Sequence, residues 1–193
     1  MALLSGLATA FGLSSAAGVN AYLPLLVVAL IARFTSLISL NEPWDVLTNW
    51  VVIGVLGVLF IIEIVADKIP VVDHVNDVIQ SVLRPVAGAI LFAAASGVVG
   101  HTHPVLAVTA GLLTAGSIHA IKATARPVVT ATTGGTGNWL VSTLEDIWSF
   151  ITAVFAILIP LLGVVLLAAG IFLLVLVWRR SRRPKRYVEN QLR

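Results

Sequence analysis

Residues that could carry protons or bind cations are concentrated in one short stretch of the chain, residues 63–77. This stretch holds four of the nine acidic residues and one of the four histidines. The candidates are Glu63, Asp67, Asp73, His74 and Asp77. Carboxylates bind hard cations, and inside membranes they also act as proton carriers. We therefore predict that the stretch is the centre of an ion or proton pathway, and we leave open whether it binds a metal.

Glu63 is the most informative of these residues, because it follows an apolar run that begins near Trp50. A helix through this run places Glu63 about 20 Å from Trp50, within the depth of a hydrocarbon layer about 30 Å thick. An ionised carboxylate at that depth costs at least ~2.5 kcal/mol, so it normally faces the protein interior or a water-filled cavity. We predict that Glu63 is the deepest ligand or proton carrier and that the other acids form the mouth of the pathway.

The spacing of the acids supports a shared face. Glu63 and Asp67 lie one helical turn apart, and Asp73 and Asp77 repeat that spacing. The alternative interpretation is that two nearby basic residues, Lys68 and Arg84, neutralise the acids at an ordinary helix end. In that case the acids have a structural role only.

Four polar residues outside the stretch are further candidates for the pathway: Asn20, Tyr22, His119 and Asn138. His119 lies near the end of a later apolar run and could exchange a proton with Glu63. Asn20 and Tyr22 lie at an expected break in the first apolar segment, and Asn138 closes a glycine-rich connector; all three could line a cavity. The alternative for Asn20, Tyr22 and His119 is an interhelical hydrogen bond without a role in a pathway. The alternative for Asn138 is a position in a flexible loop.

The composition excludes a soluble domain. Hydrophobic residues make up 59% of the 193 positions and charged residues only 11%, against about a quarter in soluble domains. The charges are also segregated, and several long runs contain none of them. These uncharged runs are 1–32, 46–62, 85–121 and 147–178. Runs of this length predict helices that cross a membrane.

We expect an all-α polytopic membrane protein with five or six crossings and some broken or re-entrant segments. Pro70 should end or kink the second span, and Arg126 with Pro127 should open a polar connector. The predicted elements are a half-helix followed by a full span within 2–34, a span at 50–67, a short amphipathic helix at 73–83, a short span at 85–100, a span at 105–123, and a run at 147–178 that crosses once as a tilted helix or twice with a turn near Pro160.

Two patterns concern how the helices pack and repeat. Gly111 and Ala115 have the spacing that lets membrane helices approach closely, and so do Ala93 and Gly97. A weak internal duplication aligns the segment that ends in Pro70 with the segment that ends in Pro127, and Val-Val follows both prolines. Repeats in membrane proteins commonly flank a central site. Chance similarity is the alternative explanation.

The basic residues predict the orientation of the chain. Seven of the twelve lysines and arginines lie in residues 179–193. We divide the chain into one transmembrane domain, 1–178, and a basic tail, 179–193, which we place in the cytoplasm against anionic lipid headgroups. The same position argues against nucleic acid as the partner. There is no cysteine, so disulfides and thiolate metal sites are excluded.

Two motifs resemble those of a known family. They are Gly-x-Asn-Ala-Tyr-Leu-Pro at residues 18–24 and Glu-x-x-x-Asp-Lys-x-Pro-x-x-Asp at residues 63–73. With them, the chain resembles a family of small bacterial integral-membrane proteins that is classified as a domain of unknown function, over about residues 5–170. The resemblance implies a location in a bacterial inner membrane. It implies no activity, ligand or functional residue.

From the residues we predict a small channel or secondary transporter for an inorganic cation, a proton or a small solute, without enzymatic activity or a cofactor. A chain of this size should form a homo-oligomer to enclose a pathway. One alternative is a non-catalytic membrane scaffold that binds a partner. A second is a lipid-active metalloenzyme that uses Asp73, His74 and Asp77 with a divalent metal.

Overall fold

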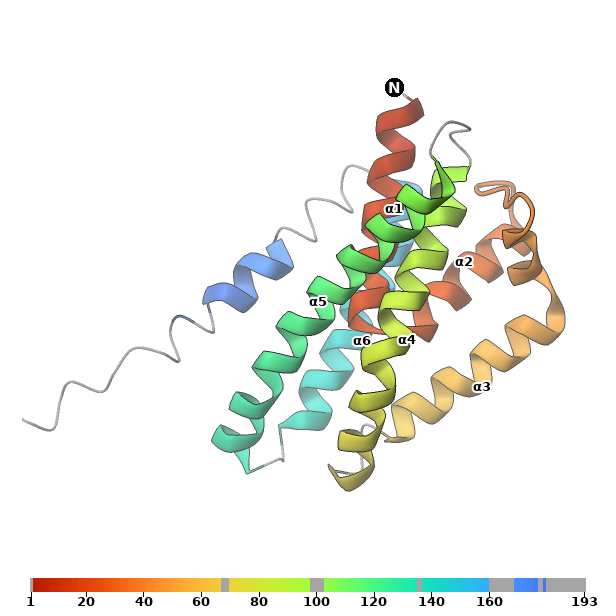
Figure 1. The fold of residues 1–193 in the computed structure, drawn as a ribbon. Helices are drawn as coiled ribbons and strands as arrows, with labels where there is room; N and C mark the ends of the chain where they lie inside the picture. The colour runs from red at the N-terminus through yellow and green to blue at the C-terminus, as the bar shows by residue number, and fades with distance from the viewer. Residues whose placement is uncertain are drawn as a thin grey trace, which may run out of the picture.

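The computed structural model describes residues 2–66, 70–97, 103–134, 137–159, 169–176 and 179, and it leaves out the side chains at several edges of these ranges. Within these ranges all regular structure is helical (Figure 1). The all-α fold class is therefore confirmed. The elements are α1 (Ala2–Val19), α2 (Tyr22–Phe34), the 3₁₀ helix η1 (Trp44–Thr48), α3 (Trp50–Ala66), α4 (Pro70–Gly97), α5 (Pro104–Thr133) and α6 (Asn138–Leu158). Residues 169–176 are also helical.

Three helices are long and apolar enough to cross a membrane, by length and composition. These are residues Val75–Ala95 of α4, Pro104–Thr133 and Asn138–Leu158. α2 and α3 are shorter apolar helices. Many large aliphatic side chains on α3, α5 and α6 are exposed in the single chain, as expected of surfaces that contact lipid. The structure thus supports a membrane protein.

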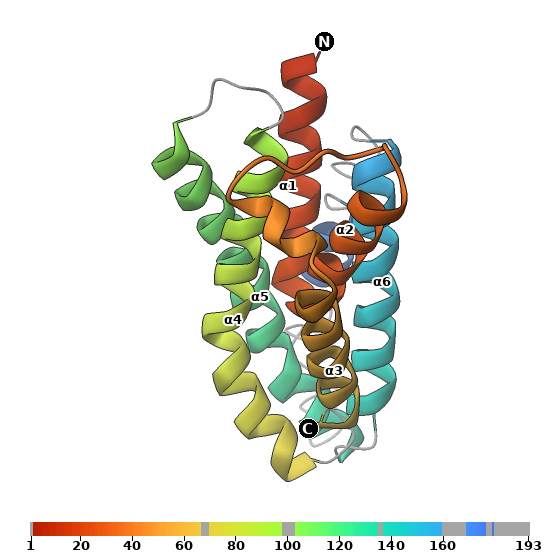
Figure 2. The ribbon, with the colours of Figure 1, turned by 90° about the vertical axis from the view of Figure 1, so that its right-hand side faces the viewer.

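α1 is the central helix of the bundle and packs against α4, α5 and α6. Figure 2 shows α1 descending from the N-terminus into the middle of the bundle, with α4 and α5 on one side of it and α6 on the other. α2 then turns back toward the end from which α1 came. α3 descends along the outside, α4 ascends the whole length, α5 descends and α6 ascends. The chain thus places a broken helical pair, α1–α2, with α1 against the three long helices α4, α5 and α6.

Small residues allow α1, α4 and α5 to lie in close contact. A Cβ atom at Gly18 would lie 2.6 Å from the carbonyl oxygen of Ala115, and a Cβ atom at Gly88 would overlap the Ala115 side chain. Ser14 of α1 donates a hydrogen bond of 2.8 Å to the carbonyl of Gly111. The predicted close approach at Gly111 and Ala115 is confirmed, and the opposing small residue is Gly88.

The first apolar segment is broken where the sequence predicted, between α1 and α2 at Asn20 and Ala21. The prediction of a full span after the break was wrong. α2 has 13 residues and is about 20 Å long, which is shorter than a hydrocarbon layer of about 30 Å. The order of lengths is the reverse of the predicted one, because α1 has 18 residues and is about 27 Å long, and the shorter helix follows the break.

Two predicted helix ends at prolines were also wrong. The expected amphipathic helix 73–83 and the short span after it are one continuous helix, α4, with Pro85 inside it. Likewise α5 continues past Pro127 to Thr133 and ends at Gly134, whose positive φ of 60° caps the helix. A proline removes one backbone hydrogen bond, and neighbouring helices in a membrane bundle compensate for it.

These helix ends also bear on the other sequence patterns. Pro70 opens α4, whereas Pro127 lies within α5, so the two segments of the predicted duplication differ in local structure. α6 ends at Leu158, just before Pro160. The predicted turn at Pro160 lies outside the described residues. The number of crossings therefore stays a prediction.

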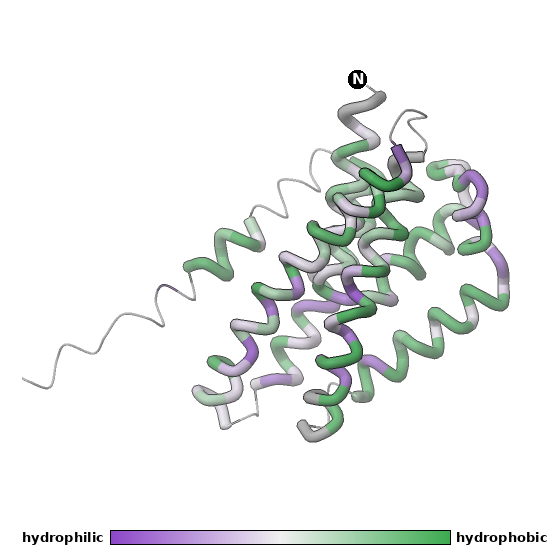
Figure 3. Tube along the Cα trace, in the orientation of Figure 1, coloured by the Kyte–Doolittle hydropathy of each residue, from purple (hydrophilic) through white to green (hydrophobic). Residues whose placement is uncertain are grey.

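Hydrophilic residues are not spread evenly through the bundle. Figure 3 shows them gathered in the lower halves of α4, α5 and α6, with another group in the connector between α2 and α3. The upper half of the bundle is mostly apolar. The polar half is the one into which the break between α1 and α2 projects (Figures 1 and 3).

Candidate functional site

A buried arginine links two of the predicted site residues. Arg84 of α4 is 0% exposed, and its Nη2 atom lies 3.4 Å from the Oε1 atom of Glu63 on α3. Its Nη1 atom lies 3.0 Å from Nδ1 of His119 on α5. Because a guanidinium only donates hydrogen bonds, the Nδ1 atom of His119 accepts this one and carries no proton. One guanidinium thus holds a carboxylate and an imidazole from two other helices.

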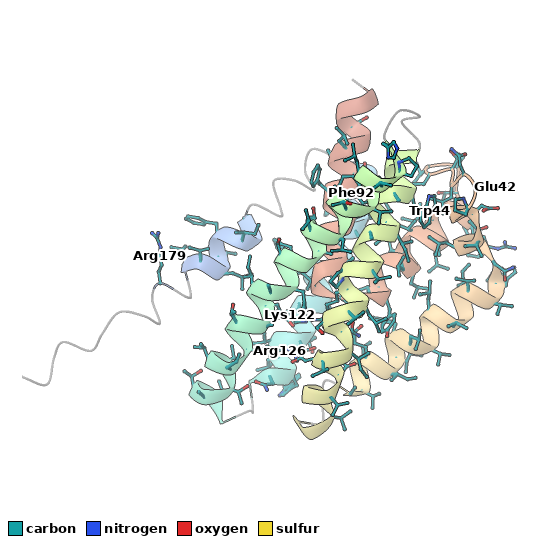
Figure 4. The ribbon with its side chains drawn as sticks, in the orientation of Figure 1. Glu42, Trp44, Phe92, Lys122, Arg126 and Arg179 are labelled. Carbon is teal, nitrogen blue, oxygen red and sulfur yellow. The ribbon has the colours of Figure 1, made fainter. Side chains whose placement is uncertain are left out.

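A second group of charges lies on the same faces of α4 and α5 and joins them to α6. Arg126 is 2.9 Å from Asp77 on α4 and 3.7 Å from Glu145 on α6. Lys122 is 2.8 Å from the same carboxylate oxygen of Glu145. Figure 4 shows Lys122 and Arg126 together in the lower half of the bundle, well below Phe92. These pairs fix the three long helices to one another.

The break between α1 and α2 meets this group of charges. Lys122 donates a hydrogen bond of 3.0 Å to the carbonyl of Val19, the last residue of α1. The carboxyl end of a helix carries partial negative charge, so a lysine there is favourable. The break is thus held by a charged side chain and not by backbone alone.

Asn20 completes the break and is fully buried. Its side-chain oxygen accepts hydrogen bonds from the backbone N–H groups of Tyr22 and Leu23, as an N-cap residue does. Its side-chain nitrogen donates to Asp146 of α6 at 2.9 Å. One asparagine therefore starts α2 and ties the break to α6, which an apolar residue could not do.

The charged side chains form a column, and their exposure rises toward one end of it. The side chains of Arg84 and Glu63 are 1% and 2% exposed, whereas those of Glu145 and Asp77 reach 20% and 29%. We call this group the polar column; its members are Glu63, Arg84, His119, Lys122, Arg126, Asp77 and Glu145. Two of its more exposed members, Asp77 and Arg126, lie toward the end of the bundle where α4 begins and α5 ends. Such a gradient is what a pathway closed at its inner end would show.

An apolar layer closes the inner end of the column. Leu13, Val28 and Leu91 are at most 1% exposed. Leu91 follows Arg84 by seven positions on α4, and Leu13 precedes Asn20 by seven, about 10 Å in each case. The layer therefore lies about two helical turns above the polar residues.

A cavity lies on the other side of the apolar layer. It has a volume of about 280 Å³ and is lined by the three residues of the layer, by hydroxyl-bearing side chains and by other apolar ones. The hydroxyl residues of the lining are Ser5, Thr9, Ser36 and Ser39. Among the lining residues that the structure describes, none is charged. The molecule thus has a polar column and an uncharged cavity, separated by three packed aliphatic side chains.

The structure brings several of the predicted site residues together. Glu63 and His119 are buried members of the polar column, and Asp77 lies at its outer end. Asn20 is buried and bonds Asp146, which follows Glu145 of the column on α6. Tyr22 is half-buried and interacts electrostatically with Glu63 and Arg84. These predicted residues therefore lie in one part of the bundle.

Other predicted site residues lie apart from the column or cannot be placed. Asn138 opens α6 and accepts a hydrogen bond from Thr130, at the connection between α5 and α6. Asp67 lies outside the described residues. Asp73 and His74 belong to α4, but their side chains are not described. Among the described residues, no three His, Cys, Asp or Glu side chains cluster as a metal site would require, and Asp77 pairs with Arg126.

Sequence reasoning missed Lys122, Arg126, Glu145 and Asp146, and it gave Arg84 only a neutralising role. A signal for them exists. His119, Lys122 and Arg126 have the spacing of one helix face, and so do Asp77, Gln80 and Arg84. Two such polar faces in apolar helices indicate that the helices pack against each other through them.

Comparison with known families identifies the family of this chain. The family model described as Domain of unknown function (DUF4126) matches residues 7–180. The chain belongs to this family. The DUF4126 match includes the polar column, the apolar layer and the break between α1 and α2. Comparison with curated proteins finds no match, and comparison with solved structures finds none either.

Proposed function

We propose that this DUF4126 protein is a small membrane channel or secondary transporter whose pathway runs through the polar column. The observation that carries the proposal is the joining of the column to the broken helix pair α1–α2, under a closed apolar layer. Discontinuous helices whose ends meet polar groups near the midplane are the usual construction of transporter sites. A cavity on the far side of the layer supplies the second access that transport needs.

The number of buried charges supports transport over a purely structural role. Ionisable residues within membrane segments are costly, and they normally mark ion, proton or substrate pathways. Here each of α3, α4, α5 and α6 contributes at least one of them to the column. Small-residue packing already joins α1, α4 and α5, so the charges that α4 and α5 carry are not needed for that contact.

Among the solutes considered, the geometry favours a proton. The carboxylate of Glu63 faces the guanidinium of Arg84, so a metal cation would meet a like charge there. A proton on Glu63 removes the attraction instead and leaves Arg84 held by His119. We therefore infer that protonation of Glu63 is the step that changes the contacts of Arg84.

We place the more exposed end of the column in the cytoplasm. Arg84, Lys122 and Arg126 belong to the column, and seven of the twelve lysines and arginines lie in the tail, which agrees with the positive-inside rule and with a tail against anionic headgroups. We infer a bacterial inner-membrane location, five or six crossings with α1–α2 re-entrant, and a homo-oligomer in contact with lipid. The aliphatic side chains exposed on α3 suit either lipid or a second copy.

Flux in proteoliposomes tests the proposal. We expect an imposed pH gradient to drive proton movement through the wild-type protein and Glu63→Gln to reduce that flux at least tenfold. Glu42→Gln is the matched control, because Glu42 is an exposed acid in the connector before η1 (Figure 4). Wild-type protein that is folded and passes no solute under any gradient would contradict transport.

One alternative is favoured by a specific observation. The ion pairs of the column connect four helices, as they would in a non-catalytic scaffold. A scaffold predicts that Glu63→Gln changes stability and that no variant changes flux. Measuring the melting temperature and the flux of the same preparation separates the two functions.

A further inference from the structure

We propose that Arg84 and Gln80 form a subsite for a small oxyanion, such as a carboxylate, and that the anion moves together with one proton carried by Glu63. The inference rests on the proposed function, because it names the solute that the pathway would carry. It is argued from buried polar atoms of Gln80 and Arg84 that take no part in the ion pairs described above.

Gln80 is the residue that the ion pairs do not explain. It is 0% exposed, and neither the oxygen nor the nitrogen of its amide has a hydrogen-bond partner among the residues that the structure describes. The Nε atom of Arg84 is likewise buried without one in that part of the chain. Buried polar groups nearly always have partners, so a group of this kind requires an explanation. A ligand that accepts hydrogen bonds from the two nitrogen donors, Gln80 Nε2 and Arg84 Nε, supplies one for them.

The two side chains can act on one ligand. Gln80 and Arg84 lie one turn apart on α4 and share a face. That face packs against α5, with Arg84 at His119 and Asp77 at Arg126. In this antiparallel register, Gln80 lies opposite Lys122. The subsite therefore lies within the polar column, between two ion pairs and close to three basic side chains.

The donors define the class of ligand. The Nε–H of Arg84 and the two N–H groups of the Gln80 amide are all donors. Planar oxyanions accept such sets of hydrogen bonds, and arginine recognises carboxylates through two parallel ones. The 3.4 Å separation between Arg84 and Glu63 is longer than the usual distance for a charge-assisted hydrogen bond. Arg84 is thus not held tightly by Glu63 alone.

Charge balance couples the anion to a proton. In the unloaded state the carboxylate of Glu63 balances Arg84. If an anion binds Arg84 while Glu63 stays ionised, the site gains a net negative charge at membrane depth, which is costly. If a proton from water in the column forms an O–H bond on Glu63, the anion takes over as the counter-ion of Arg84. No bond of the anion changes, and the net charge of the site is the same in both states.

Binding is tested with the purified protein in detergent. The probes are sodium nitrate and sodium glycolate, with sodium gluconate as the ionic-strength control. We expect either small probe to raise the melting temperature of the wild-type protein, as a ligand of the folded state does. We expect Gln80→Leu to weaken the apparent affinity at least tenfold, because it removes the amide donors. A response to both nitrate and glycolate indicates a general oxyanion site, and a response to glycolate alone indicates a carboxylate site.

The same variant gives a second readout that a structural role would not give. Without a probe, Gln80→Leu should melt at a higher temperature than the wild type, because an apolar side chain replaces a buried amide without partners. Ser81→Leu on the exposed face of α4 is the matched control, and it should keep the response to the probes. A lower melting temperature for Gln80→Leu, or an unchanged response to the probes, would overturn the proposal.

Flux separates the failure of this inference from the failure of the proposed function. An inward nitrate gradient should drive proton uptake into proteoliposomes, and clamping the membrane potential should leave the rate unchanged. Nitrate is used because it does not cross lipid as a neutral acid. Proton flux that Glu63→Gln abolishes but that nitrate does not affect would overturn the inference and leave the proposed function standing. No proton or anion movement at all would overturn both.

Discussion

At the scale of single residues, Arg84 decides the state of the site. It is fully buried and lies between Glu63 and His119, which belong to two different helices. A buried ion pair adds little net stability, because desolvation of the two charges offsets their attraction. Removing only one partner, however, leaves a charge inside the membrane without its counter-ion. Arg84 is therefore needed mainly because Glu63 is present.

This gives the first prediction. Arg84→Met should lower the free energy of unfolding by about 3–5 kcal/mol, since it removes the guanidinium that faces the buried Glu63 carboxylate. The double variant Glu63→Leu with Arg84→Met should recover most of the loss, because both charges are then absent. Chemical unfolding in mixed micelles measures both. If the double variant is less stable than the single one, the pair stabilises the fold in its own right.

At the scale of elements, close packing of α1, α4 and α5 sets the register that aligns the charges. Gly88 lies against Ala115 and Gly18 against the Ala115 backbone. One turn before Gly88 on α4, this register places Arg84 beside His119, which lies one turn after Ala115 on α5. Because the helices meet at glycine, a larger side chain at the contact would separate them. The small residues thus position the charged ones.

The second prediction tests this dependence. Gly88→Ala should lower stability by about 1–3 kcal/mol, because its Cβ atom would overlap the Ala115 side chain. It should also reduce proton flux, since α5 must shift away from Arg84. Gly57→Ala on α3 is the matched control, because a Cβ atom there meets nothing within 4 Å. Alanine favours a helix over glycine by about 1 kcal/mol, so the control should be neutral or more stable.

A normal flux in Gly88→Ala, together with the expected loss of stability, would show that the register of α4 and α5 does not control the pathway. The control variant excludes a general effect of adding a methyl group to a helix of this protein. Both variants are measured in the same lipid, because helix association in membranes depends on lipid packing.

At the scale of the whole molecule, the apolar layer separates two differently built halves. Below it lies the polar column, and above it the uncharged cavity. Leu13, Val28 and Leu91 come from three helices, and two of these helices belong to the broken pair α1–α2. α2 is the shortest α-helix of α1 to α6, and the break separates it from α1, so this pair can move against the long helices more readily than an unbroken span can. We expect that displacement of this pair opens the layer.

The third prediction concerns the layer itself. Leu91→Ala should leave a small void between the column and the cavity and increase the uncoupled leak of protons several-fold, because water can then bridge them. The leak is measured as dissipation of a pH gradient in proteoliposomes. Leu106→Ala is the matched control, because Leu106 is an exposed leucine on α5. An unchanged leak in folded Leu91→Ala would show that the layer is not the barrier.

Much of the plan of this protein follows from its sequence. Long uncharged runs dictate helices in a membrane, and the break at Asn20 follows from a side chain that caps a helix between glycine and proline. The burial of Glu63 was predicted from its distance to Trp50, and the structure has it buried. These features depend on local chemistry and helix length, which a sequence states directly.

Only the tertiary structure decided which residues meet. Glu63 faces Arg84 on the next helix, whereas the expectation of a pathway had emphasised neighbouring acids. Lys68, which the alternative interpretation also offered, lies outside the described residues. The polar faces of α4 and α5 indicate that the two helices pack together, but the sequence does not state which residues of the two faces meet. The register of α4 against α5 resolves this, since glycine contacts fix it and the charges then align.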